Sequence, residues 1–262
     1  MNEIERLSNE NYLESFRVHA RFQEPCEVKD RDGILLVAGA SDFPGSYWNA
    51  AARTTLQVKP GALVKAAHAF FAPRRRMYSL SVIGNQDGDL EDYLRTHGYE
   101  LRFEMPCLSL TQPLPSREVP DGLRVVTITE PKHTRDFVEL SVEAYTQMRL
   151  PERHTRALFS KPVAMLADNI TGFIVYRGEE ALAGALVMMS GDGAGIYWVG
   201  TRPSAERMGL ATLLTTLTAN AAFARGARVV TLQASKSGEP VYRRLGFEFY
   251  DNIRRYGPAS LD

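Results

Sequence analysis

The sequence has only two cysteines, no excess of either charge and no long apolar run. Cys26 and Cys107 lack a metal-ligand spacing and a nearby histidine pair, which argues against a disulfide framework or a metal site. The 31 basic and 31 acidic residues cancel, so neither nucleic acid nor a membrane surface is expected as a partner. No stretch approaches the roughly 18 apolar residues of a membrane span, and the N-terminus lacks a secretory pattern. We therefore expect a cytoplasmic globular protein with reduced thiols and no bound metal.

The composition is otherwise that of an ordinary globular protein, with one proline-rich interruption. Hydrophobic residues make up 44% of the 262 residues and charged residues 24%, enough for one large or two modest domains. Residues 111–122 contain three prolines and a glycine and show no hydrophobic periodicity. We therefore expect a first domain over residues 1–112, a linker over 113–122 and a second domain over 123–262.

Three features of the first half recur in the second half at a nearly constant distance. Tyr47-Trp48 and Tyr197-Trp198 are 150 positions apart. The other two pairs are Ala69-Phe-Phe with Ala221-Ala-Phe, 152 apart, and Gly98-Tyr-Glu with Gly246-Phe-Glu, 148 apart. Such constant offsets indicate a tandem duplication.

One segment of the second half has the features of an anion-binding site. An apolar strand, Ile196–Thr201, leads through a polar loop with Arg202 and Arg207 into a helix that begins near Gly209. The first turn of a helix has unpaired N–H groups and a positive dipole end, and a glycine there admits a ligand close to the backbone. The segment fits neither a Walker loop nor a dinucleotide fingerprint. The glycines of residues 191–195 predict a hairpin turn instead.

Hydrophobic periodicity gives the order of elements in the second half. The expected strands are 123–129, 173–176, 183–189, 196–201, 229–233 and one from 247 onward. The expected helices are 137–148, a segment within 152–169, 209–225 and a short helix that ends at Leu245, with Gly246 as its cap. This order predicts an α/β fold, a mixed sheet flanked by helices.

Residues 122–256 resemble the Gcn5-related N-acetyltransferases, the GNAT superfamily. The family's loop signature begins with arginine or glutamine, followed by any two residues, a glycine, any one residue, and a glycine or alanine. Gly209 and Ala211 match this signature, whereas Glu206 stands in place of its first residue. The family's closing motif, a tyrosine before Leu-Gly-Phe, is matched by Tyr242 and residues 245–247. The resemblance implies two GNAT-like lobes in tandem, with two central strands that part to admit acetyl-CoA.

The resemblance also implies which residues contact the acyl donor. The backbone of Val199, Gly200 and Thr201 would hold the pantetheine, and Ser235 stands where the family often has an asparagine. Tyr242 would be the acid that protonates the leaving CoA sulfur. The amides that would hold the pyrophosphate are those of Arg207, Met208, Gly209, Leu210, Ala211 and Thr212.

No general base is assigned from the sequence. Glu143 is a possible base, yet a glutamate on an amphipathic helix is usually only solvated. Tyr145 and Trp198 could line an acceptor pocket or belong to the core, and strand alternation predicts that Tyr197 and Trp198 point to opposite faces. The two remaining candidates, His133 and His154, could equally be exposed helix residues.

The first half is expected to have lost the cofactor site. Aligned on Gly98 and Gly246, Leu94 stands opposite Tyr242, and Pro60 removes an N–H where a donor is needed. This degenerate half would then serve packing or substrate selection.

The sequence predicts an acetyl-CoA-dependent N-acetyltransferase that works by direct attack in a ternary complex. The acceptor would be a small-molecule or peptide amine, and the protein a monomer or homodimer. The alternative is a non-catalytic acyl-CoA sensor or scaffold with the same fold.

Overall fold

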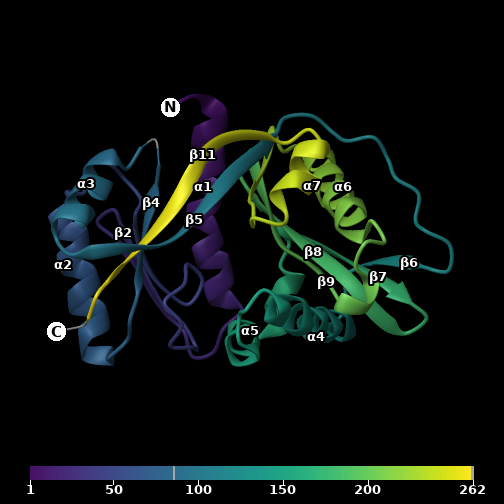
Figure 1. Cartoon of the computed structure of the whole chain (residues 1–262), viewed down its shortest axis with the longest axis horizontal. Coiled ribbons are helices and arrows are strands. Elements are labelled where there is room, and N and C mark those ends of the chain that lie inside the picture. The colour runs from purple at the N-terminus through teal and green to yellow at the C-terminus, as the bar shows by residue number, and fades with distance from the viewer. Residues whose placement is uncertain (85, 261–262) are drawn as a thin grey trace.

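A single mixed sheet of eleven strands runs through the described part of the protein, with helices on both faces (Figure 1). The structure is a computed structural model that describes residues 1–84 and 86–260. The strands are β1 (Glu27–Arg31), β2 (Ile34–Ala38), β3 (Asn49–Arg53), β4 (Ser79–Ile83), β5 (Tyr99–Leu110), β6 (Arg124–Thr127), β7 (Ile170–Arg177), β8 (Glu180–Ser190), β9 (Gly193–Thr201), β10 (Val229–Gln233) and β11 (Glu248–Pro258). The α-helices are α1 (Glu3–Arg21), α2 (Pro60–Phe71), α3 (Gly88–Thr96), α4 (Pro131–Gln147), α5 (Glu152–Leu158), α6 (Leu210–Ala224) and α7 (Glu239–Arg244). Short 3-10 helices cover Ala72–Arg74, Pro162–Leu166 and Pro203–Ala205.

The sheet is nearly symmetric about its two central strands, β11 and β5, which cross the middle of the molecule in Figure 1. The strand order is β1-β2-β3-β4-β11-β5-β10-β9-β8-β7-β6. β11, from the end of the second half, pairs antiparallel with β4 and β5, whereas β5, from the end of the first half, pairs antiparallel with β11 and β10. Each half of the chain therefore completes its part of the sheet with the final strand of the other half.

The elements of the two halves repeat at a nearly constant spacing. The matching pairs are α2 and α6, β4 and β10, α3 and α7, and β5 and β11, and their first residues are 149 to 151 positions apart. The strands β1, β2 and β3 likewise match β7, β8 and β9 in pairing and order. The fold is thus α/β with two similar halves in tandem. We call the elements from α1 to β5 the first lobe and those from β6 to β11 the second lobe, although α1 packs mainly against β8, β9 and β10.

The elements expected in the second half are present, with shifted ends. β10 has the expected bounds, whereas α4 begins six residues earlier than expected, at Pro131, because proline is favoured in the first turn of a helix. Turns at 178–179 and 191–192 join β7 to β8 and β8 to β9. Residues 111–122 contain no helix or strand, and Leu114 fixes them to α6 through two hydrogen bonds of 2.8 Å with the Asn220 side chain.

The duplicated Tyr-Trp pairs meet each other across the two lobes. The rings of Tyr47 and Tyr197 lie edge to face with centroids 6.3 Å apart, and those of Trp48 and Trp198, the only tryptophans of the sequence, lie 6.4 Å apart. Such T-shaped contacts are favourable beyond the burial of area. The two pairs do not lie on matching elements, because Tyr47 and Trp48 lie in a turn before β3 whereas Tyr197 and Trp198 lie within β9. Both pairs nevertheless form part of the interface between the lobes.

Each indole N–H donates a hydrogen bond to the opposite lobe. Trp48 donates to the carbonyl of His154 in α5 at 2.8 Å, and Trp198 donates to Nε2 of His19 in α1 at 2.9 Å. The His154 ring is buried, and its Nδ1 lies 2.5 Å from the Ser41 hydroxyl. Of the two alternatives that the sequence left open for His154, the exposed helix residue is therefore wrong, because the first lobe covers α5.

His19 is a buried neutral histidine and should make stability depend on pH. Its Nδ1 lies 2.6 Å from the carbonyl oxygen of Ser15, and burial lowers its pKa from 6.5 to about 3. Between these pH values the unfolded chain binds one more proton than the folded protein. Stability should therefore fall as pH drops below about 6.5, by up to about 1.4 kcal/mol per pH unit from this residue.

His19→Gln should remove this share of the pH dependence. The measurement is the free energy of unfolding of both proteins at several pH values between neutral and about 5. If the free energy of unfolding depended on pH equally in the variant and the wild type, His19 would not be held neutral by the fold.

Candidate active site

The strands β9 and β10 separate at the level where the sequence places the acyl donor. They pair in parallel only from Val229 opposite Gly193 to Thr231 opposite Gly195. β10 continues to pair with β5 as far as Gln233, whereas residues 196–201 of β9 have no strand partner on this side. The parted central strands implied by the resemblance are therefore present in the second lobe.

A β-bulge lies in β9 at this separation. The register with β8 shifts between Gly184 and Leu186, and Trp198 has a φ of 57°, which is rare for a bulky residue. As a result Tyr197 and Trp198 both pack in the core against α1, α4 and α5, although they are neighbours in a strand. The expectation that they face opposite sides is wrong, because the bulge interrupts the alternation.

The N-terminus of α6 presents a run of free backbone donors. The first helical bond runs from Leu213 N to Gly209 O, and within the described chain the N–H groups of residues 207–212 make no hydrogen bond. Arg207 and Gly209 have φ values of 63° and 75°, so the loop enters the helix through left-handed conformations. Successive amides in such turns can converge on one anion. A Cβ at position 209 would meet no atom within 4 Å, so the space beside it is open.

The two arginines near this loop differ in their surroundings. Arg202 lies 3.4 Å from Glu143 and 3.8 Å from Glu180, whereas Arg207 is exposed and has no ion-pair partner among the residues that the structure describes. Only Arg207 is therefore available to an anion at the helix. The carboxylate of Glu143, a possible base from the sequence, is held by Arg202.

Two tyrosines approach the separated strands from opposite sides. Tyr242 on α7 packs against Phe247, and its hydroxyl makes no hydrogen bond within the described chain; burial raises its pKa to about 12. Tyr145 on α4 donates a hydrogen bond to the carbonyl of Val199 at 3.4 Å. Burial, and then the nearby Tyr242 and Tyr47, raise the pKa of Tyr145 well above its usual value. Both hydroxyls therefore stay protonated near neutral pH.

Ser235 lies in the loop between β10 and α7. Its hydroxyl accepts a hydrogen bond from the Gly238 N–H at 3.1 Å and lies 3.3 Å from the Ser237 hydroxyl. The side chain thus helps to begin α7, the helix that carries Tyr242.

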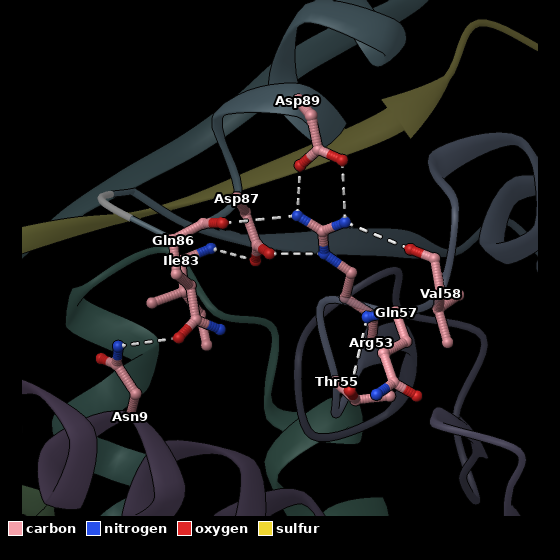
Figure 2. Close-up of polar contacts among 9 residues, drawn as sticks. All are labelled: Asn9, Arg53, Thr55, Gln57, Val58, Ile83, Gln86, Asp87 and Asp89. Carbon is pink, nitrogen blue, oxygen red and sulfur yellow. Dashed lines mark hydrogen bonds and ion pairs between the residues drawn. The ribbon is translucent and has the colours of Figure 1, made fainter. Parts of the chain in front are cut away.

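In the first lobe the corresponding strand ends are filled by a charged side chain. β3 and β4 pair at only two positions, and β3 then ends in Arg53, whose side chain is 1% exposed. Its guanidinium donates hydrogen bonds to Asp87 at 2.6 Å, to Asp89 and to the carbonyl of Val58 at 3.2 Å (Figure 2). This network and Pro60 at the start of α2 occupy the place that stays open in the second lobe.

Two hollows of about 540 Å³ each lie away from the start of α6. The first lies between α7 and the central strands, where Arg243 and Lys236 face Phe103 and Phe249. The second lies beside α1, and neither includes Tyr242 or the amides of residues 207–212. The candidate site is therefore defined by unpaired backbone groups.

Residues 116–242 match the family model described as an acetyltransferase (GNAT) domain. The matched residues, 116–242, form a GNAT domain. The GNAT match ends at Tyr242 and includes the bulge, the α6 loop and Ser235. No curated protein sequence matches the chain significantly.

Solved structures show that the GNAT fold extends over the whole chain. A GCN5-related N-acetyltransferase from Kribbella flavida is 18% identical, with a TM-score of 0.74 over 99% of this chain and 97% of that one. A tandem GNAT protein from the clavulanic acid biosynthesis pathway is 15% identical, with a TM-score of 0.66 over 97% and 96%. A third, from Sphaerobacter thermophilus, is 15% identical, with a TM-score of 0.62 over 87% and 81%. These likenesses establish the tandem GNAT fold.

Two further features concern only the described residues. Among them no helix combines the length and the apolar character needed to cross a membrane. Residues 1–84 and 86–260 also contain no group of three or more histidine, cysteine, aspartate or glutamate side chains placed to hold a metal ion.

Proposed function

We propose that this protein is an N-acyltransferase that moves an acetyl group from acetyl-CoA to an amine within a ternary complex. One observation carries the proposal: the free N–H groups at the start of α6 lie where β9 has lost its partner strand. A pyrophosphate suits such a helix terminus, and a pantetheine amide can pair with an open strand edge. The membership of residues 116–242 in a family of acetyltransferases supports acetyl-CoA as the donor.

The proposed binding contacts come mainly from the backbone. The amides of residues 207–212 would hold the pyrophosphate, and residues 199–201 of β9 would hold the pantetheine. Tyr145 already donates to the Val199 carbonyl, so this hydroxyl would have to share that oxygen with the pantetheine or release it. Ser235 would position α7, and with it Tyr242, beside the bound pantetheine.

In the proposed reaction the amine nitrogen attacks the thioester carbon and the carbon–sulfur bond breaks. The sulfur leaves as a thiolate and gains a proton, while the acceptor nitrogen loses one proton to solvent. Tyr242 would stabilise the thiolate by donating a hydrogen bond, because its pKa of about 12 keeps the hydroxyl protonated. A thiol has a pKa of roughly 8.5, so solvent can supply the proton that sulfur finally holds.

The two lobes would have different roles. The second domain, residues 123–262, would bind the donor and carry out the transfer. The first domain, residues 1–112, would not bind CoA, because Arg53 and Pro60 occupy the corresponding place. Instead it would support the acceptor side through α1 and the aromatic interface.

Ala211→Pro should weaken acetyl-CoA binding about 10- to 100-fold. Proline is tolerated in the first turn of a helix but removes one N–H, and a hydrogen bond to a charged group contributes about 1.5–3 kcal/mol. Calorimetric titration with acetyl-CoA measures the effect, and Ala211→Ser, which keeps the N–H, is the matched control. Equal affinity of both variants would remove the amide from the site.

A transfer assay separates catalysis from mere binding. Release of free thiol from acetyl-CoA in the presence of an amine panel would establish turnover. Binding of acetyl-CoA without turnover on any amine would instead indicate the sensor or scaffold.

A further inference from the structure

The matching helices α3 and α7, on either side of the central strands, carry the same ion pair (Figure 1). Glu91 pairs with Arg95 at 2.9 Å in α3, and Glu239 pairs with Arg243 at 2.7 Å in α7. The corresponding residues are 148 positions apart, which is the offset of the glycines that follow these helices. The two pairs are therefore copies of one feature, and their surroundings can be compared directly.

In the first lobe this pair holds a guanidinium group from the central strands. One carboxylate oxygen of Glu91 accepts a hydrogen bond from the Tyr256 hydroxyl at 2.7 Å, and the other lies 3.3 Å from Nη1 of Arg254 on β11. Arg254 also donates from its Nε to Glu104 on β5 at 2.7 Å. A single arginine thus fixes α3 to both central strands.

The register of β5 with β11 shows which residue takes the place of Arg254 in the second lobe. The pairing is symmetric about Met105 opposite Ile253, so each position on one strand has a counterpart on the other. Pro106 on β5 is the counterpart of Arg254 on β11. The short proline ring carries no guanidinium, so the contact that fixes α3 has no equivalent at α7.

The place of the guanidinium is instead the hollow of about 540 Å³ between α7 and the central strands. Its volume is in the range of small-molecule sites. Pro106, Asn252 and Glu239 all line it, and Asn252 is the counterpart of Glu104 in the strand register. One oxygen of Glu239 binds Arg243, whereas the other has no hydrogen-bond or ion-pair partner among the residues that the structure describes. The oxygen that binds a guanidinium in the first lobe is thus free in the second.

Two aromatic side chains of the hollow are unusually exposed. Phe103 and Phe249 line it, and 48% and 46% of their surfaces are exposed. A guanidinium group stacks favourably on aromatic faces, and Arg243 already lies over the ring of Phe249 at 5.9 Å. The hollow therefore offers both a carboxylate and an apolar surface to a planar cation.

The charges that line the hollow balance. Two carboxylates, of Glu104 and Glu239, face two cations, of Lys236 and Arg243. Arg243 does not exclude a further guanidinium group, because its counterpart in α3 shares one glutamate with Arg254. Lys236 is exposed and has no ion pair within the described chain. A ligand with one charge of each sign would therefore match the free oxygen of Glu239 and the free ammonium of Lys236.

We propose that this hollow binds a small molecule that carries both a guanidinium and a carboxylate group, as free arginine does. The guanidinium would bind Glu239 and Asn252, and the carboxylate would bind Lys236. A free amino acid fits better than an arginine within a protein chain, because the latter has no carboxylate for Lys236. The site is separate from the proposed acyl-donor site and does not depend on it.

Such a ligand would fix α7 as Arg254 fixes α3. None of the side chains of α7 is buried, whereas α3 buries Leu90 and Leu94. The position of α7 therefore depends more on contacts of this kind than the position of α3 does.

The test is calorimetric titration of the wild type and of Glu239→Gln with three probes. Arginine carries both charged groups, citrulline has the same shape with a neutral ureido group, and agmatine has the guanidinium group without the carboxylate. Glu248→Gln is the matched control, because Glu248 is an exposed glutamate that does not line the hollow. Pro106→Arg is a further variant, which places an arginine of the chain itself in the hollow.

We expect arginine to bind the wild type and Glu248→Gln about 10- to 100-fold more tightly than citrulline, because a hydrogen bond between charged groups is lost with the neutral probe. Agmatine should also bind more weakly than arginine. Glu239→Gln should weaken arginine binding about 10- to 100-fold. Pro106→Arg should abolish arginine binding and, without ligand, melt at a higher temperature than the wild type.

Three results would overturn the inference: no binding of arginine to the wild type, equal affinity for arginine and citrulline, or undiminished arginine binding by Glu239→Gln. Agmatine that binds as tightly as arginine would overturn the assignment of an amino acid, because Lys236 would then contribute nothing. If Pro106→Arg does not fold, Glu239→Gln and the citrulline comparison decide the question alone. Acetyl-CoA is absent from all these measurements, so a failure here leaves the proposed function untouched.

Discussion

Replacing Arg53 by methionine should lower the free energy of unfolding by about 3–5 kcal/mol. The variant leaves the carboxylate of Asp87, 1% exposed, without its cation, and the Ile83 N–H at 2.8 Å is then its only donor within the described residues. Burial already raises the pKa of Asp87, and the hydrogen bond from the Ile83 N–H and the guanidinium of Arg53 oppose this rise. Removal of one partner from a buried pair costs more than the pair itself contributes, since the other charge stays buried.

Chemical denaturation near neutral pH measures this loss. Arg6→Met is the matched control, because Arg6 pairs with Glu10 on the surface of α1, where both side chains are about half exposed. Exposed pairs of this kind contribute about 0.3–0.5 kcal/mol. If Arg53→Met cost no more than Arg6→Met, the network in Figure 2 would not hold the first lobe together.

Tyr242→Phe should lower kcat about 100-fold and leave the affinity for acetyl-CoA almost unchanged. The variant keeps the ring that packs against Phe247 but removes the only hydroxyl that α7 brings to the separated strands. Its donor role is needed as the carbon–sulfur bond breaks, so the loss should appear in turnover and not in binding of the ground state.

Thiol release and calorimetry on the same preparations separate the two effects. Tyr93→Phe provides the control, because Tyr93 lies on α3, the helix that matches α7, and faces the start of α2 at Gly61. An unaltered rate in Tyr242→Phe would remove this residue from the mechanism, whereas weakened acetyl-CoA binding would make it a binding residue.

Local pattern was sufficient to predict the second lobe. Apolar runs and glycine turns gave the order of β7, β8, β9, α6 and β10, because each of these elements has its own periodicity in the sequence. The offsets of Ala69 with Ala221, in α2 and α6, and of Gly98 with Gly246, before β5 and β11, gave the duplication, since repeated copies preserve spacing. The Tyr-Trp pairs share this offset but lie on elements that do not match.

The pairing between distant segments could not be predicted in this way. Nothing in the periodicity of β5 or β11 indicates that each lies in the other lobe's part of the sheet, because strand partners are chosen by the global topology. The bulge at Trp198 was missed for a similar reason: a single residue in a left-handed conformation leaves no trace in an apolar run.

The polar residues of the interior were also missed. Nothing in the sequence distinguishes Arg53 from the exposed arginines, and only the structure shows that it is buried and paired with Asp87 and Asp89. Tyr47 had a signal in the repeat, but its edge-to-face contact with Tyr197 follows from the packing of the two lobes. The candidate site residues of the second lobe remain predictions until a ligand is bound.

The exchange of final strands makes the first lobe indispensable even though its own strand ends are closed. A protein that ended at residue 112 or began at residue 123 would form a sheet without one of its two central strands. The strand next to the gap would then have unpaired backbone hydrogen-bonding groups and be prone to aggregation. Loss of ligand binding in one copy could therefore never be followed by loss of the copy itself. After duplication, the exchange of strands would have kept both copies in the protein, because each completes the sheet of the other.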